Sequence, residues 1–143
     1  RPLKLTDEVI ARLEQSLPPD VPEAQRRAFL DTLRNPPKAP VDRVIRPGEE
    51  LPFCGGLVVI GTPGHTPGHI SLYHRPSRTL IAADALRVVD GQLVGPSEEM
   101  TLDMARARAS LKAFTAFDVA TVICYHGGAY ADEPNRRLAE LAG

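Results

Sequence analysis

Eight consecutive residues, Thr62-Pro63-Gly64-His65-Thr66-Pro67-Gly68-His69, constrain the fold more than any other stretch of the chain. The prolines and glycines exclude a regular helix across this segment. Apolar runs flank it at residues 57–60 and 70–73, and both have the composition of short strands. The segment is therefore predicted to be a tight loop at a strand end that projects two histidine side chains, a position where function is commonly found.

Two further apolar runs end at a side chain that can bind a metal. Residues 79–83 lead into Asp84, and residues 119–124 lead through Tyr125 into His126. Loops at the ends of strands often bring residues from distant parts of a chain together. Imidazole and carboxylate ligands suit Zn²⁺, with Fe or Mn as alternatives. We therefore expect His65, Asp84 and His126 to converge on a metal.

Each of these residues also has a simpler interpretation. The two loop histidines can serve as hydrogen-bonding partners of the loop itself. Asp84 can cap a turn after its strand, which is a common use of aspartate. His126 can orient the glycine turn that follows it, and His74 beside Arg75 is predicted to be a surface residue.

On these residues the chain resembles the metallo-β-lactamase superfamily, whose metal-binding pattern includes a Thr-Pro-Gly-His-Thr-Pro-Gly-His loop. That family continues with a Gly-Asp-(Ala/Thr)-Leu element, which Ala83-Asp84-Ala85-Leu86 matches except at Ala83. The resemblance spans roughly residues 41–143. It implies that His65 binds one metal, that His126 binds a second and that Asp84 bridges the two. His69 would act in catalysis indirectly, through a hydrogen bond to a ligand or to the leaving group.

The resemblance also implies an activity. In the intact enzyme two Zn²⁺ ions, or Fe or Mn, would supply a metal-bound hydroxide that hydrolyses the ester, thioester or lactone bond of a small-molecule substrate. The tandem histidine loop favours the glyoxalase II and lactonase branches of the superfamily. Two other functions stay open, namely a metal-free binding or structural module of the same fold and a single-iron persulfide dioxygenase.

The first metal-binding motif of that family, His-x-His-x-Asp-His, does not occur among these 143 residues. Together with the Arg1-Pro2 start, this absence predicts the C-terminal part of a longer hydrolase, inactive by itself. The expected α/β fold is an αββα sandwich that lacks its N-terminal part. A sheet edge exposed by the missing part would permit two copies to pair as a homo-oligomer.

Two domains are expected, a helical insertion or lid in residues 1–40 and the C-terminal portion of the fold in residues 41–143. Helices are predicted at about 6–17, 22–33, 101–117 and 133–141, where apolar residues recur at helical spacing. Strands are expected at 41–45 and 51–54 in addition to those that flank the histidine loop. Asp90-Gly91 predicts a hairpin turn between strands at 86–89 and 92–94.

Composition excludes some classes of function. The net charge of −1 argues against a nucleic-acid or acidic-membrane binder, and the sequence contains no apolar stretch of transmembrane length. Cys54 and Cys124 each lie in an apolar run, which fits buried free thiols better than a disulfide. Free thiols favour a reducing compartment, so we expect a cytoplasmic protein.

Overall fold

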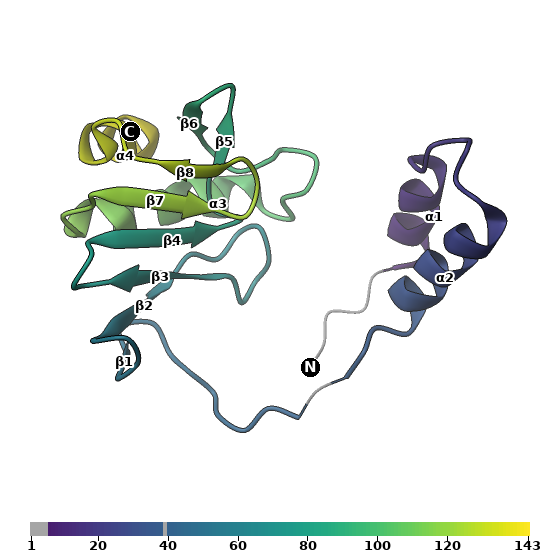
Figure 1. Ribbon diagram of the computed structural model, residues 1–143, viewed down its shortest axis with the longest axis horizontal. Coiled ribbons are helices and arrows are strands. Elements are labelled where there is room, and N and C mark those ends of the chain that lie inside the picture. The colour runs from purple at the N-terminus through teal and green to yellow at the C-terminus, as the bar shows by residue number, and fades with distance from the viewer. Residues whose placement is uncertain (1–5, 39) are drawn as a thin grey trace. The chain divides into compact units, whose positions relative to one another are not determined.

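The structure is a computed structural model that describes residues 6–38 and 40–143. The chain divides into two compact units, Arg1–Arg43 and Val44–Gly143. The first contains helices α1 (Asp7–Gln15) and α2 (Glu23–Arg34), both at positions where the sequence predicted them (Figure 1). Helix α1 begins where the side chain of Thr6 accepts a hydrogen bond from the Val9 N–H group. A lid role for the first forty residues stays a prediction.

The second unit is built on a six-stranded sheet. Its strands are β1 (Glu50–Leu51), β2 (Leu57–Gly61), β3 (Ile70–His74), β4 (Thr79–Ala83), β7 (Thr121–Cys124) and β8 (Gly128–Tyr130), in that spatial order. Neighbouring strands are antiparallel except for β4 and β7, which are parallel. Strands β2, β4 and β7 consequently run in one direction, and their C-terminal ends lie at the same end of the sheet. The pairing of two copies through an outer strand stays a prediction.

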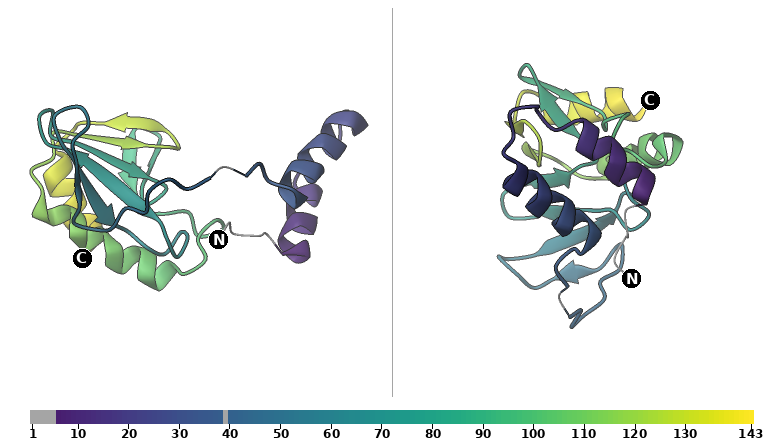
Figure 2. Two further views of the ribbon diagram at one scale, coloured as in Figure 1. Left: turned by 90° about the horizontal axis from the view of Figure 1, so that it is seen from below. Right: turned by 90° about the vertical axis from the view of Figure 1, so that its right-hand side faces the viewer.

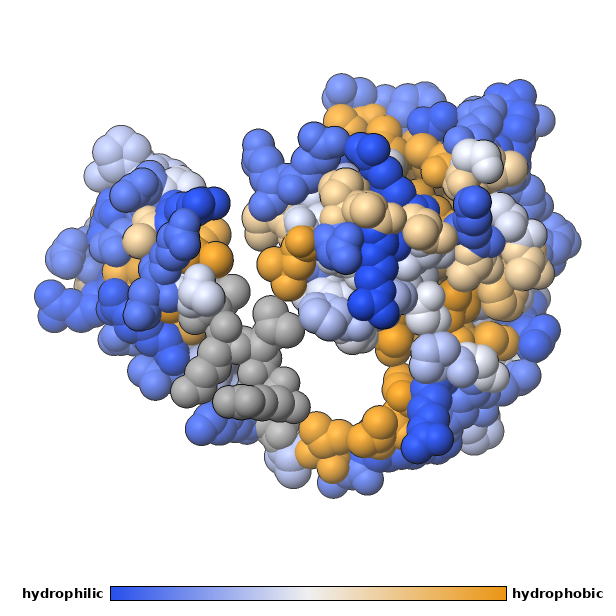
Figure 3. Space-filling model, turned by 180° about the vertical axis from the view of Figure 1, so that it is seen from behind, coloured by the Kyte–Doolittle hydropathy of each residue, from blue (hydrophilic) through white to orange (hydrophobic). Residues whose placement is uncertain are grey.

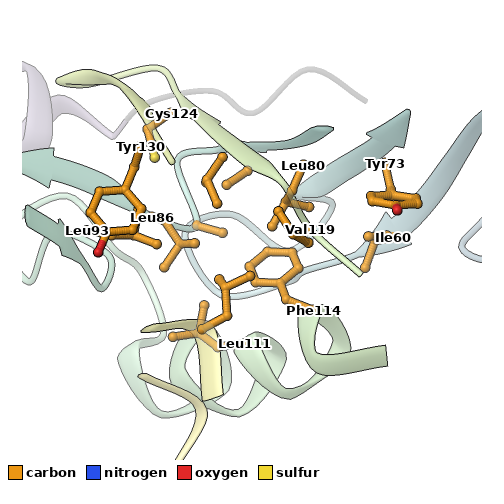
Figure 4. Packing of buried hydrophobic residues seen from close by; sticks show 14 of the residues in the cluster. Ile60, Tyr73, Leu80, Leu86, Leu93, Leu111, Phe114, Val119, Cys124 and Tyr130 are labelled. Carbon is orange, nitrogen blue, oxygen red and sulfur yellow. The ribbon is translucent and has the colours of Figure 1, made fainter. Parts of the chain in front are cut away.

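A layer of helices covers one face of this sheet (Figure 2). It consists of α3 (Met104–Ser110), the 3₁₀-helix η1 (Leu111–Ala116) and α4 (Pro134–Ala142). Phe114 and Leu111 extend from this layer toward the sheet, where Phe114 and Leu80 have no exposed surface (Figure 4). Burial of each such side chain stabilises the fold by about 1.5–3 kcal/mol. One sheet and one helical layer make the half-sandwich that the sequence predicted.

The predicted hairpin turn at Asp90-Gly91 is confirmed. It joins β5 (Arg87–Val89) to β6 (Gln92–Val94), which form a separate two-stranded sheet. Asp90 and Gly91 have φ angles of 50° and 75°. A turn of this type requires a positive φ at both central residues, which is why the Asp-Gly pair predicts it well.

The strand predicted at residues 41–45 is wrong. Residues 41–45 have no regular structure, and Val41 and Val44 are largely exposed. The next segment takes the place beside β2 instead, where the Gly48 N–H group donates to the Val59 carbonyl and β1 pairs with β2. Residues 41–45 therefore have no neighbouring strand to satisfy their backbone groups. The strand predicted at 51–54 is reduced to the two residues of β1.

The helix predicted at 101–117 starts later and changes type. Asp103 caps α3 by accepting from the Arg106 N–H group, at 2.9 Å. The preceding Leu102 N–H group donates to the His65 carbonyl instead of joining a helix. After Ser110 the chain tightens into η1, whose three residues per turn place Leu111 and Phe114 on one line facing the core. Strand β8 was not predicted, because Gly127 precedes it and Gly128 is its first residue, and both weaken its strand signal.

The face shown in Figure 3 is mostly hydrophilic, with apolar residues in small groups. No helix in the described part of the chain is long and apolar enough to cross a membrane. Cys124 is buried as expected, and its burial raises the pKa of the thiol to about 11. Cys54 is exposed, contrary to expectation, because it lies in the turn after β1 with a φ of 53°. A cytoplasmic location stays a prediction.

Two glycines in the second unit have no room for a side chain. A Cβ atom on Gly64 would lie 2.3 Å from the backbone of Ala107, and one on Gly127 would lie 1.9 Å from the Val88 carbonyl oxygen. Both glycines also have a positive φ. We expect Gly64→Ala and Gly127→Ala each to lower the free energy of unfolding by about 2–3 kcal/mol, measured by urea denaturation.

Gly68 provides the matched control in the same loop as Gly64. It has open space around it and no positive φ, so Gly68→Ala should change the free energy of unfolding by less than about 0.5 kcal/mol. Equal stabilities of all three variants would show that the two close backbone contacts are absent.

Candidate metal centre

Three loops at one end of the sheet carry the candidate site. His65 lies in the loop after β2, Asp84 directly follows β4, and His126 lies two residues beyond β7. Because these strands run in the same direction, their loops emerge together. The predicted convergence of three strand ends therefore follows from the parallel pairing of β4 with β7.

The structure brings all three predicted residues together. The Nε2 atom of His65 is 3.7 Å from Oδ2 of Asp84, and the Nε2 atom of His126 is 3.3 Å from Oδ1 of the same carboxylate. The side chains of His65 and Asp84 are 21% and 23% exposed, whereas that of His126 is 74% exposed. Each oxygen of one carboxylate thus faces a different imidazole.

This arrangement differs from a site around a single ion. Among residues 6–38 and 40–143, no three His, Cys, Asp or Glu side chains form a group that could hold one metal ion. The two imidazoles instead lie near different oxygens of one carboxylate. The Nδ1 atom of His65 is buried and has no hydrogen-bond partner among the described residues, so this ring is not held by bonds of its own. The donor types suit a divalent cation of borderline softness, and the ligand roles stay predictions.

A bulge at the end of β4 aims the Asp84 side chain. The register between β4 and β7 shifts between Ile81 and Ala83, after which Ala83 pairs with Cys124. Ala83 has a φ of 53°, a left-handed conformation that costs a residue with a Cβ atom about 1–2 kcal/mol. This is the position where the sequence departs from the glycine of the resembled motif. Bulges of this kind commonly redirect a side chain next to a functional site.

His69 lies beside the site with both ring nitrogens engaged. Its Nε2 atom accepts a hydrogen bond from the Asp84 N–H group at 3.2 Å. Its Nδ1 atom lies 2.8 Å from Oγ1 and 3.1 Å from the carbonyl oxygen of Thr62. Burial, followed by the charge of His65, lowers the pKa of the His69 imidazole. His69 therefore contacts the backbone N–H group of Asp84, a predicted ligand. Both of its ring nitrogens are engaged, so neither is free to bond to a leaving group. The catalytic role of His69 stays a prediction.

Elements far along the chain hold the loops that carry His65 and His126. The Leu102 and Asp103 N–H groups donate to the carbonyls of His65 and Gly64, which fixes the first loop against the start of α3. The Val88 N–H group donates to the His126 carbonyl at 3.0 Å, which fixes the last loop against β5. Backbone bonds thus set the position of both loops.

A cavity of about 350 Å³ opens at the site. Besides His65, Asp84 and His126, it is lined by three residues that the sequence analysis missed, Arg87, Ser97 and Met100. The Arg87 Nε atom donates to the Gly95 carbonyl at 3.3 Å, and its guanidinium has no carboxylate within ion-pair distance in the described chain. No sequence pattern linked β5 or the segment after β6 to the histidine loops, so nothing in the sequence indicated that these three residues line the site.

Two further residues near the site were also missed, the buried hydroxyls Thr62 and Ser71. They are 2% and 1% exposed, and their oxygens lie 3.0 Å apart. A signal for Ser71 existed in the sequence. It is a polar residue two positions from Tyr73 on the core-facing side of an apolar strand, where a hydroxyl needs a hydrogen-bond partner.

Comparisons with known proteins agree with this fold. The model of the metallo-beta-lactamase superfamily matches residues 7–126, so the similarity begins at α1, well before the start expected near residue 41. The probable metallo-hydrolase YflN of Bacillus subtilis (strain 168) is 33% identical over 88 residues, which cover 54% of this chain and 33% of that protein.

Solved structures show the same fold. A metallo-beta-lactamase family protein from Thermus thermophilus has a TM-score of 0.58 and 28% identity, over 94% of this chain and 44% of its own. An archaeal superfamily protein from Sulfolobus tokodaii has a TM-score of 0.58 and 19% identity, over 97% of this chain and 52% of its own. The chain thus spans about a third to a half of the length of these relatives. By its sequence match and its fold, this chain belongs to the metallo-β-lactamase superfamily.

Proposed function

We propose that the protein containing this chain is a metal-dependent hydrolase of ester, thioester or lactone bonds, with His65, Asp84 and His126 as metal ligands. The observation that carries the proposal is the pairing of each Asp84 oxygen with a separate imidazole, at 3.7 and 3.3 Å. A carboxylate placed in this way suits a bridge between two cations, with one histidine at each end.

Two divalent cations, zinc in this proposal with iron or manganese as alternatives, would lower the pKa of a bound water and polarise the scissile carbonyl. Within this chain, Asp84 would supply the negative charge that attracts the cations. His65 and His126 each contribute one neutral nitrogen. Three side chains do not complete two coordination shells, so the proposal requires further ligands beyond these 143 residues.

The cavity supports a small-molecule substrate. Its volume of about 350 Å³ lies at the small end of the range for ligand pockets. Met100 offers an apolar wall, and Arg87 offers a cation without an acidic partner among the described residues. A small ester, thioester or lactone with a negatively charged group fits this lining. The net charge of the chain and the cavity lining favour neither a nucleic acid nor a membrane as partner.

Metal binding provides the first test. We expect Asp84→Asn and His65→Ala each to weaken zinc binding by more than about 100-fold. Even the loss of a residue that only hydrogen-bonds to a metal ligand lowers metal affinity by about 10–100-fold. Zinc affinity is measured by competition with a chromogenic chelator, and metal content is measured by elemental analysis.

Matched variants control for general effects on the fold. Asp132 is an exposed carboxylate outside the site, and His74, the last residue of β3, bonds to Ser77 and the Cys54 carbonyl. Asp132→Asn and His74→Ala should keep the affinity of the unsubstituted chain. A chain that binds no zinc, or one that binds it equally well without Asp84, would support a metal-free module of the same fold.

Hydrolysis provides the second test, carried out in the whole protein that contains this chain. We expect His65→Ala to reduce kcat/KM for a panel of carboxylate-bearing esters, thioesters and lactones by at least about 100-fold, together with the metal content. Turnover and metal content that both persist in His65→Ala would refute the assignment. Oxygen consumption with a persulfide substrate, without hydrolysis of the panel, would support the dioxygenase alternative.

A further inference from the structure

Four hydrogen bonds near the site follow one another in a closed path. The Asp84 N–H group bonds to His69 Nε2 at 3.2 Å, and His69 Nδ1 bonds to Thr62 Oγ1 at 2.8 Å. Thr62 Oγ1 in turn lies 3.0 Å from Ser71 Oγ, which donates to the Ala82 carbonyl at 3.1 Å. The path therefore begins at the Asp84 N–H group and ends at the Ala82 carbonyl, and the backbone of residues 82–84 closes it.

The chemistry of the groups assigns every proton along this path. A backbone N–H group can only donate, so His69 Nε2 is the acceptor and the neutral ring carries its proton on Nδ1. That proton is shared between Thr62 Oγ1 and the Thr62 carbonyl. Since Ser71 donates to the Ala82 carbonyl, its oxygen accepts from the Thr62 hydroxyl. All bonds point in one direction, and such chains of hydrogen bonds strengthen one another.

The path encloses Ala83. This residue is buried, follows the register shift of β4 and has a φ of 53°, a conformation that disfavours residues with a Cβ atom. Such conformations persist only where the surroundings impose them. Here the bonds hold the carbonyl before Ala83 and the N–H group after it. The next side chain along is the Asp84 carboxylate, which faces His65 and His126.

We propose that Thr62, Ser71 and His69 form a clamp that holds the bulge at Ala83 and thereby positions the Asp84 carboxylate for metal binding. The metal-binding part of this proposal rests on the proposed function. The three residues are positioning residues, because they act on the carboxylate through the backbone of residues 82–84 and contact no substrate. Thr62 and Ser71 suit this task because the surrounding strand ends bury them almost completely.

The test breaks the clamp at its hydroxyls. Thr62→Val keeps the shape of the side chain but removes its oxygen, and Ser71→Ala removes the bond to the Ala82 carbonyl. Each should weaken zinc binding by about 10–100-fold, the range found for outer partners of metal ligands. Thr62→Ser should restore the affinity, because it restores the hydroxyl. Thr115→Val, which removes an exposed hydroxyl bonded to Lys112, is the matched control. Unchanged zinc affinity in folded Thr62→Val and Ser71→Ala chains would overturn the proposal.

A second substitution tests whether Thr62→Val weakens zinc binding through Ala83 or through a general loss of stability. Glycine adopts a left-handed conformation without the steric penalty, so an Ala83→Gly chain depends less on the clamp. In that background Thr62→Val should weaken zinc binding by less than about 3-fold. An equal loss of affinity with and without Ala83→Gly would contradict a clamp on Ala83.

A measurement without metal distinguishes failure of the clamp from failure of the proposed function. Nitrogen-15 NMR of the metal-free chain should show His69 protonated on Nδ1 and unprotonated on Nε2. The Asp84 amide should exchange with solvent more slowly than in Thr62→Val. The opposite tautomer, or equal exchange of that amide, would overturn the clamp even if zinc binds. A chain with these NMR properties that binds no zinc would instead refute the metal site and leave the clamp on the bulge standing.

Discussion

The parallel pairing of β4 with β7 is the contact on which the candidate site depends. Parallel neighbours end at the same side of a sheet, so the residues after Ala83 and after Cys124 emerge next to each other. Strand β2 runs in the same direction two positions away and adds the loop with His65. A shift of one residue in this pairing would turn Asp84 toward the opposite face and separate the carboxylate from both imidazoles.

Elements outside the sheet fix the loops that carry the histidines. The His65 loop lies against the beginning of α3, and the His126 loop lies against β5, with no space for a Cβ atom at Gly64 or Gly127. These contacts also explain a local feature of the fold. The Leu102 N–H group is used by the His65 loop, so the helix starts at Met104, after the Asp103 cap. The site and the helical layer therefore constrain each other.

Burying a hydroxyl at a strand end costs free energy of folding, and this cost is offset only when every polar atom has a hydrogen-bond partner. Thr62 and Ser71 meet this condition through each other, through His69 and through the Ala82 carbonyl. Their bonds surround Ala83, which takes a left-handed conformation although it is not a glycine. Ala83, which replaces the glycine of the Gly-Asp element, thus lies inside a polar network that joins Thr62 and His69 of the histidine loop to Ser71 of β3.

The sequence by itself determined the features that depend on near neighbours. Prolines and glycines in residues 62–69 excluded a helix, Asp90-Gly91 specified its turn through the sign of φ, and His65, Asp84 and His126 were recognisable because each follows an apolar run. Only the tertiary structure decided what depends on distant partners. It left residues 41–45 without a neighbouring strand, added β8 beside β7, and joined Thr62, Ser71 and Arg87 to the site. Periodicity and steric preference act over a few residues, whereas register, burial and the satisfaction of polar groups arise between segments far apart in the chain.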